Sequence, residues 1–130
     1  MNMSTAVRHV LSNYAVFSGR APRSEYWWWI LAIVIFFAVL GLIEGALIAP
    51  MMGFEAFQPE AGRPLSLVFS LGLLLPNIAV SVRRLHDTDR SGWWLLLALI
   101  PLLGSLVLIF FYVQPGTDGA NRFGGQDDGG

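Results

Sequence analysis

Arg83-Arg84-Leu85-His86-Asp87-Thr88-Asp89-Arg90-Ser91-Gly92-Trp93-Trp94 is a dense charged segment between two long apolar runs of the sequence. The runs before and after it, about 65–82 and 93–113, have the length and composition of membrane-spanning segments. A tryptophan pair closes the segment, and tryptophan is enriched where a span meets the membrane surface. We therefore expect this segment to lie at a membrane–water interface.

The composition supports a membrane protein of one domain. Of 130 residues, 55% are hydrophobic and only 13% are charged, against roughly 25% charged in soluble domains. A net charge of −1 argues against a nucleic-acid partner. All eight basic residues are arginine, which suits bidentate binding of phosphate or carboxylate. The absence of cysteine excludes disulfides, thiol catalysis and thiolate metal sites.

The first part of the chain, residues 1–25, is expected to form an amphipathic helix followed by an arginine-rich turn. Apolar side chains recur at helical spacing between residues 4 and 17, at Val7, Val10, Leu11, Tyr14 and Phe17. This pattern predicts a helix lying in the headgroup region of the bilayer. The alternative is a helix outside the membrane that packs on the loops.

The first span is predicted over 26–49, beginning with four aromatic residues. Its length of ~36 Å crosses a hydrocarbon core of ~30 Å. Glu44 is its one charge and lies ~27 Å beyond Tyr26 along the axis, near the far interface, where we expect its carboxylate to reach water. The alternative is a proton or cation site. A stripe of small residues would let a neighbouring helix approach closely: Gly41, Gly45 and Ala49.

The second span is predicted over 65–82, with a polar stripe along one side formed by Ser66, Ser70, Asn77 and Ser81. Pro76 cannot donate to the carbonyl of Gly72, so we expect a kink there. The backbone carbonyl left unpaired beside Asn77 is then either satisfied by a neighbouring helix or a serine hydroxyl, or available to a ligand or a water.

The third span is predicted over 93–113, with Pro101 and Gly104 at its centre. The alternative is a re-entrant hairpin, whose arms of about ten residues are each too short to cross. The glycine-rich tail, 114–130, is expected to be flexible. The fold class is therefore all-α: an integral membrane helical bundle of three transmembrane helices, with an N-terminal amphipathic interfacial helix.

The distribution of arginines predicts the orientation. Three spans place six arginines on one side, at Arg8, Arg20, Arg23, Arg83, Arg84 and Arg90. Arg63 and Arg122 fall on the other side. The positive-inside rule then puts the N-terminus in the cytoplasm and the tail outside. A re-entrant third segment would instead return the tail to the cytoplasm.

Three spans also bring two charged segments, residues 20–25 and 83–90, to one membrane face. Together they form a candidate site for an anion or a partner protein: Arg20, Arg23, Glu25, Arg83, Arg84, His86, Asp87 and Arg90. The plainer interpretation is a charge network that fixes how the helices leave the bilayer. His86, Asp87 and Glu25 are too few for a typical metal site. No phosphate loop, zinc-protease helix or nucleophile elbow occurs, so no catalytic residue, metal ligand or cofactor is predicted.

Three ordered motifs carry a resemblance to a known family. They are Phe17-Ser18-Gly19-Arg20-Ala21-Pro22-Arg23-Ser24-Glu25-Tyr26-Trp27-Trp28, the run from Pro76 into Arg83-Arg84-Leu85-His86-Asp87 with Ser91-Gly92-Trp93-Trp94, and Pro115-Gly116 with Asn121-Arg122-Phe123-Gly124. Over nearly the whole chain the sequence resembles the domain-of-unknown-function family 805, small bacterial inner-membrane proteins. Pro22 stands where that family more often has serine. The resemblance implies a multi-span protein of the bacterial inner membrane and supplies no activity.

Three functions fit these observations, and we rank them in order. The first is a non-enzymatic accessory protein whose cytoplasmic arginine face binds anionic lipid or a partner protein. The alternative is a subunit of an oligomeric transporter or channel, which rests on Glu44, Pro76 and the polar stripe that contains Asn77. The third is a membrane enzyme that uses His86 and Asp87 on a lipid-linked substrate. The expected partners are the bilayer and, beyond it, a membrane protein or further copies of the chain.

Overall fold

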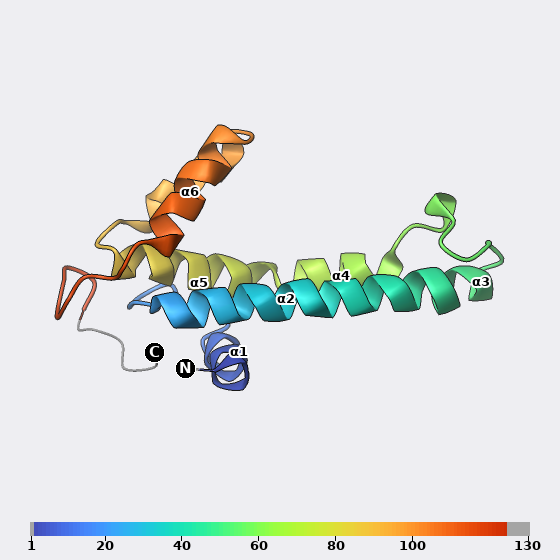
Figure 1. The fold of residues 1–130 in the computed structure, drawn as a ribbon, viewed down its shortest axis with the longest axis horizontal. Coiled ribbons are helices and arrows are strands. Elements are labelled where there is room, and N and C mark those ends of the chain that lie inside the picture. Colours follow the sequence, from blue (N-terminus) through green and yellow to red (C-terminus); the bar gives the residue numbers. More distant parts are fainter. Residues whose placement is uncertain (1, 125–130) are drawn as a thin grey trace. The chain divides into compact units, whose positions relative to one another are not determined.

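The structure is a computed structural model that describes residues 2–124 (Figure 1). Every regular element in this range is a helix, which confirms the predicted all-α class. The chain divides into two compact units, the first made of Met1–Ile30 with Leu75–Gly130 and the second of Leu31–Leu74. Each unit is described by itself below.

The N-terminal helix, α1, spans Met3–Ser12 and is shorter than the predicted stretch to residue 17. Its first turn is capped by Asn2, whose side chain accepts a hydrogen bond from the backbone N–H of Thr5 at 2.9 Å. Ala6 and Val10 are buried. The remaining apolar side chains of the predicted stripe are mostly exposed, Leu11, Tyr14 and Phe17 among them. The helix therefore packs on the protein through one narrow face and leaves an apolar flank open.

The first predicted span is confirmed as one long apolar helix, Arg23–Met51. It consists of α2 (Arg23–Ile43), a π-helical segment η1 (Glu44–Ile48) and α3 (Ala49–Met51). Only 11% of its most apolar 18-residue window is buried inside the protein. A core helix of a soluble protein would be mostly buried, so the exposed apolar surface makes this helix a candidate membrane span.

The second predicted span is divided into α4 (Pro64–Gly72) and α5 (Leu74–Asp87). The two helices are long and apolar enough to cross a membrane only when they are taken together as one bent pair. The interruption falls at Leu73, between Gly72 and Pro76, so the helix bends in the turn where the kink was expected. Pro76 is the third residue of α5, where a backbone N–H has no partner within its own helix and proline is tolerated.

The prediction of a single span over 93–113 is corrected by the structure, which shows a helical hairpin (Figure 1, orange). A 3₁₀ helix, η3 (Gly92–Leu99), and the α-helix α6 (Leu103–Val113) pack against each other. Near the base the rings of Trp94 and Phe111 lie 5.5 Å apart. Pro101 interrupts the backbone ladder at the tip, and Gly104 brings the arms together, because a Cβ there would overlap the carbonyl oxygen of Leu97.

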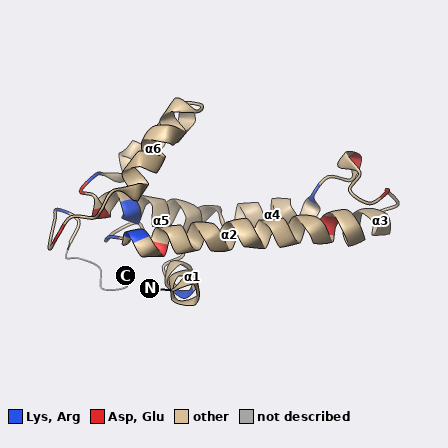
Figure 2. Cartoon of the chain, in the orientation of Figure 1, with Lys and Arg blue, Asp and Glu red and all other residues tan. Residues whose placement is uncertain are grey.

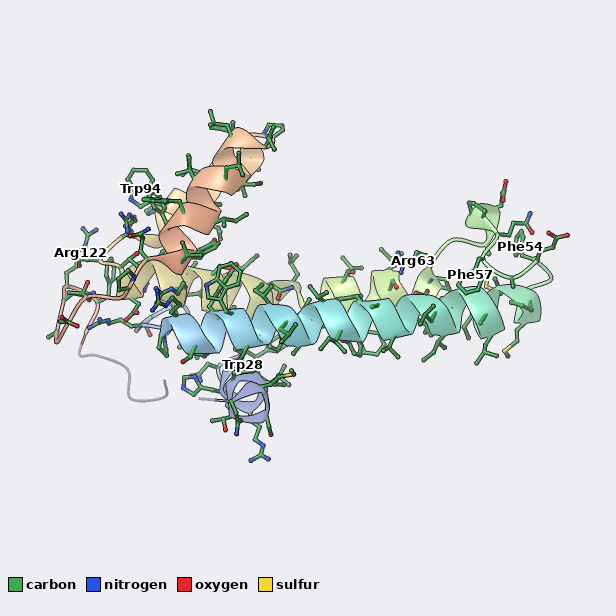
Figure 3. The ribbon with its side chains drawn as sticks, in the orientation of Figure 1. Trp28, Phe54, Phe57, Arg63, Trp94 and Arg122 are labelled. Atoms are coloured by element: carbon green, nitrogen blue, oxygen red, sulfur yellow. The ribbon has the colours of Figure 1, made fainter. Side chains whose placement is uncertain are left out.

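In the second unit, the small-residue stripe receives the chain's own connection rather than a neighbouring helix. Phe57 lies against Gly45 and Arg63 against Gly41, so that a Cβ at either glycine would overlap these side chains (Figure 3). The N–H of Phe57 also donates to the carbonyl of Gly45 at 2.9 Å, within the π-helical segment. The rings of Phe36 and Phe69 lie 5.1 Å apart and join α2 to α4.

Candidate functional site

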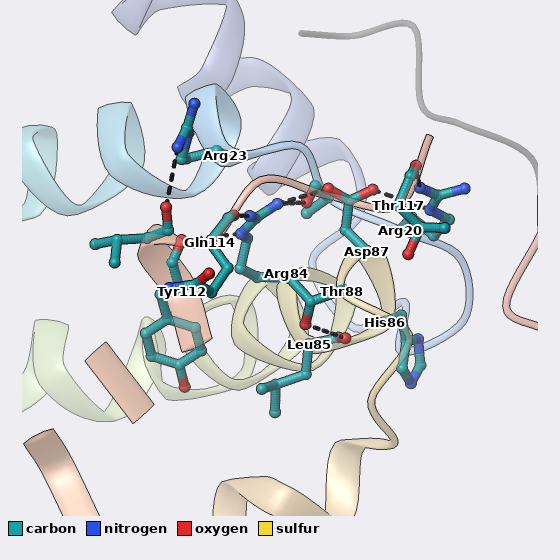
Figure 4. A network of polar contacts seen from close by, with 12 residues as sticks. Arg20, Arg23, Arg84, Leu85, His86, Asp87, Thr88, Tyr112, Gln114 and Thr117 are labelled. Carbon is teal, nitrogen blue, oxygen red and sulfur yellow. Dashed lines mark hydrogen bonds and ion pairs between the residues drawn. The ribbon is translucent and has the colours of Figure 1, made fainter. Parts of the chain in front are cut away.

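Arg84, in the last turn of α5, is the centre of a buried polar network in the first unit (Figure 4). Its side chain is fully buried, and its guanidinium donates to four acceptors. Three are backbone carbonyls, those of Tyr112 at 3.1 Å, Ala21 at 3.0 Å and Gln114. The fourth is the carboxylate of Asp87, at 2.6 Å. One side chain therefore joins α5 to the turn before α2 and to the exit of α6.

Asp87 links a second buried arginine to this network. Arg20 Nε donates to Asp87 Oδ1 at 2.9 Å, and the rest of its guanidinium donates to the carbonyls of Thr117, Gly119 and Gly124. The backbone carbonyl of Asp87 also accepts from the N–H of Thr117 at 2.7 Å. Residues 114–124, expected to form part of a flexible tail, are thus docked on the arginines. Residues 125–130 lie outside the described part of the chain.

The third buried arginine, Arg83, pairs with Glu25 on the first turn of α2. Arg83 Nη1 donates to Glu25 Oε1 at 2.9 Å, and His9 Nδ1 of α1 lies 2.6 Å from the same oxygen. The side chains of Arg83 and Glu25 are 3% and 0% exposed. Glu25 therefore holds α1 and α5 together.

His86 takes part in docking the tail. Its Nδ1 lies 2.8 Å from the carbonyl oxygen of Gly19, and its ring stacks on Phe123 with centroids 3.9 Å apart. Asn121 donates to the His86 carbonyl at 2.9 Å. His86 lies beyond the predicted span 65–82, and burial lowers its pKa below the ordinary value. Within residues 2–124, no three His, Asp or Glu side chains converge to form a metal site.

The other arginines of the first unit lie outward and are here called the outer arginines: Arg8, Arg23, Arg90 and Arg122. Arg23 donates to the carbonyl of Val113 at 2.9 Å, and Arg90 lies over the ring of Phe111 at 4.0 Å. Arg122 is within 3.3 Å of Asp89, with both side chains about half exposed. Figure 2 shows charged segments gathered around the start of α2 and the end of α5, with a further basic segment on α1.

Glu44 and Asn77, the candidate intramembrane polar residues, both have internal partners. Glu44 is 3% exposed, which corrects the expectation that its carboxylate reaches water. It accepts from the N–H of Leu65 at 2.8 Å and from the hydroxyl of Ser66, at the start of α4. A carboxylate at this position satisfies N–H groups that a helix leaves unpaired. Asn77 accepts from Trp29 Nε1 at 2.7 Å, on α2 of the first unit.

The site contains features that the sequence did not reveal. Most acceptors of the buried arginines are backbone carbonyls, which no residue pattern marks. Arg122 was assigned to the opposite membrane side from Arg20 and Arg84, but it lies in the same compact unit. The motif at 121–124 carried a signal, because its Asn and Phe contact His86.

The chain is similar to known inner membrane proteins of bacteria. Residues 14–125 match the model of a family described as a protein of unknown function, DUF805. The chain belongs to this family. It is 49% identical over 115 residues to the inner membrane protein YhaH of Escherichia coli strain K12, covering 88% of this chain and 89% of that protein. It is 44% identical to the inner membrane protein YhaI of the same strain, covering 88% of each. No solved structure matches the chain.

Proposed function

We propose that this DUF805 protein is a non-enzymatic accessory protein of the bacterial inner membrane that binds anionic phospholipid headgroups through its outer arginines. In this proposal the chain crosses the bilayer through Arg23–Met51 and through the pair α4 and α5, with residues 83–87 at the end of α5 lying beyond the hydrocarbon core. Both ends of the chain then lie on the cytoplasmic side, and the connection between the two spans faces the periplasm.

The dimensions of the hairpin support this topology. η3 has eight residues and α6 has eleven, so each arm is ~16 Å long at ~2.0 and ~1.5 Å per residue. This is about half of a ~30 Å hydrocarbon core. The hairpin therefore enters one leaflet and returns to the side from which it came.

The charges support the same orientation. The first unit holds seven of the eight arginines. Its acids within residues 2–124 are Glu25, Asp87, Asp89 and Asp118. The connection between the proposed spans carries Arg63 against Glu55 and Glu60. By the positive-inside rule, the first unit's charged end belongs in the cytoplasm.

The observation that carries the lipid proposal is the division of the arginines into two groups. Arg20 and Arg84 donate their hydrogen bonds to Asp87 and to backbone carbonyls, and Arg83 donates to Glu25. The buried arginines are therefore structural and have no free access to a headgroup. The outer arginines face outward, and each basic residue near an anionic membrane surface contributes ~1 kcal/mol of attraction.

The other two functions have less support. A transport pathway needs polar groups that face it, but Glu44 and Asn77 are engaged within the protein. An enzyme would need a general base beside a nucleophile. His86 instead directs Nδ1 to a carbonyl and stacks its ring on Phe123.

Native mass spectrometry of the protein, purified in detergent and supplied with phosphatidylglycerol or phosphatidylcholine, tests the proposal. Wild type should retain phosphatidylglycerol preferentially, and replacing all four outer arginines by glutamine should abolish that preference. The single variant Arg23→Gln should lower retention about fivefold, the equivalent of ~1 kcal/mol. Arg63→Gln is the matched control, because Arg63 is exposed but lies in the second unit near Glu44. A quadruple variant that is folded and keeps the wild-type preference would refute the proposal.

A further inference from the structure

An apolar groove runs along the first unit between α5 and η3. It has a volume of about 700 Å³. Ile78, Val82 and His86 line it from α5, at intervals of four residues that place them on one side of that helix. Leu95 and Leu99 line it from η3, and Ser91 lines it just before that helix. Its depth at one point is set by Gly92, which packs against Val82 closely enough that a Cβ would force a shift.

We propose that this groove holds an acyl chain of a membrane phospholipid whose anionic headgroup lies at the end of the groove next to Arg90 and Arg122. The inference rests on the proposed function, which supplies the headgroup contacts, and adds a site for the hydrocarbon chain.

The length of the groove suits an acyl chain. The groove follows η3, whose eight residues extend ~16 Å, the depth of about one leaflet. An acyl chain lying along it would therefore run from the headgroup region towards the middle of the bilayer.

The polarity of the groove indicates the direction in which the acyl chain lies. Its polar lining residues, His86 and Ser91, are at the end where the charged segment 83–90 joins η3. The far end, at Ile78 and Leu99, is apolar. A phospholipid has the same gradient, from a polar headgroup to a hydrocarbon tail.

Two cations lie at the polar end of the groove. Arg90 immediately precedes Ser91, and Arg122 lies 4.8 Å from the ring of Phe123, which in turn stacks on His86. Asp89 neutralises part of this charge through its contact with Arg122. One positive charge remains at this end to attract an anionic headgroup.

The test distinguishes binding of the acyl chain from binding of the headgroup. Native mass spectrometry compares retention of dioleoyl phosphatidylglycerol and dioleoyl phosphatidylcholine by wild type, Leu96→Trp and Leu106→Trp. Leu96 lines the groove, and tryptophan there fills it. Leu106 is as exposed as Leu96, at 55% against 56%, but lies on α6 outside this groove. Thermal unfolding in detergent confirms that each variant is folded.

We expect Leu96→Trp to lower retention of both lipids about tenfold, while Leu106→Trp matches wild type. If the outer arginines do not select anionic lipid but the groove binds a chain, the two lipids are retained equally and Leu96→Trp still loses both. If wild type prefers phosphatidylglycerol and a folded Leu96→Trp keeps it fully, the groove proposal is wrong and the headgroup proposal stands. A wild-type dimer that retains no lipid and dissociates in Leu96→Trp would also overturn the groove proposal.

Discussion

Asp87 Oδ2 accepts a hydrogen bond of 2.6 Å from Arg84 Nη1 one turn earlier in α5, and the two side chains are 7% and 0% exposed. A buried ion pair is stable only when its remaining donors and acceptors are also satisfied. Here Arg20 occupies the second carboxylate oxygen, and backbone carbonyls occupy the rest of Arg84. This pair therefore fixes where the turn before α2, the end of α6 and the tail meet.

Replacing Asp87 by asparagine is expected to destabilise the protein strongly. The substitution leaves the charges of Arg20 and Arg84 buried without a counter-ion, which costs ~3–5 kcal/mol of unfolding free energy. Thermal unfolding in detergent measures the loss. Asp89→Asn is the matched control: its partner Arg122 is about half exposed, so its effect should be ~0–1 kcal/mol. Equal effects of the two substitutions would contradict a structural role for the Asp87 network.

Gly104→Ala is expected to open the hairpin. The new methyl group overlaps the carbonyl oxygen of Leu97, and relieving that overlap should cost ~1–3 kcal/mol. Gly72→Ala provides the control, because a Cβ at Gly72 meets nothing within 4 Å, and alanine there should be neutral or stabilising by up to ~1 kcal/mol. Both are measured by thermal unfolding. A continuous third span would tolerate alanine at position 104 without this loss.

Glu44→Ala is expected to loosen the start of α4. Loss of a capping group typically costs ~0.5–2 kcal/mol, and the amides of Leu65 and Ser66 should exchange hydrogen faster. Exchange measured by mass spectrometry on peptides covering residues 60–75 reports this directly. Glu60→Ala, at an exposed acid of the same unit, should leave exchange unchanged. Unchanged exchange in Glu44→Ala would show that the carboxylate has a different role.

Acidification is expected to weaken tail docking through His86. Burial lowers the pKa of His86 from its ordinary value of 6.5, so the unfolded chain takes up this proton more readily than the folded chain. The resulting stability is complete above about pH 6.5 and is lost as the pH falls below it. Melting temperatures between pH 7.5 and 5.5 should therefore decline more steeply in wild type than in His86→Gln. Identical slopes in the two proteins would contradict this prediction.

The parts of the fold that depend on local composition could be predicted from the sequence. The apolar length after Tyr26 was sufficient to identify the first helix, because only a span needs so long an apolar run. The segment 93–113 was ambiguous, since a kinked span and a hairpin with Pro101 at its tip have the same composition. The contact of Gly104 with Leu97 that distinguishes them is tertiary.

The charged residues of the buried network are among those that the sequence predicts at one membrane face, but most of their pairings could not be predicted. Arg84 with Asp87 follows from helical spacing, whereas Arg83 with Glu25 and Arg20 with Asp87 are contacts across 58 and 67 residues. Glu44 was misassigned for the same reason, because its acceptor role depends on how the chain returns to the start of α4.

In the proposed topology both ends of the described residues 2–124 lie on the same side of the membrane, and cysteine labelling tests this most directly. The chain has no cysteine, so Ser4→Cys, Glu60→Cys and Ala120→Cys each introduce a single thiol at an exposed position. A membrane-impermeant thiol reagent is applied to spheroplasts before and after lysis. We predict that Glu60→Cys reacts before lysis, and that Ser4→Cys and Ala120→Cys react only afterwards. Reaction of Ala120→Cys in intact spheroplasts, with Ser4→Cys still protected, would contradict this topology and would indicate three full spans.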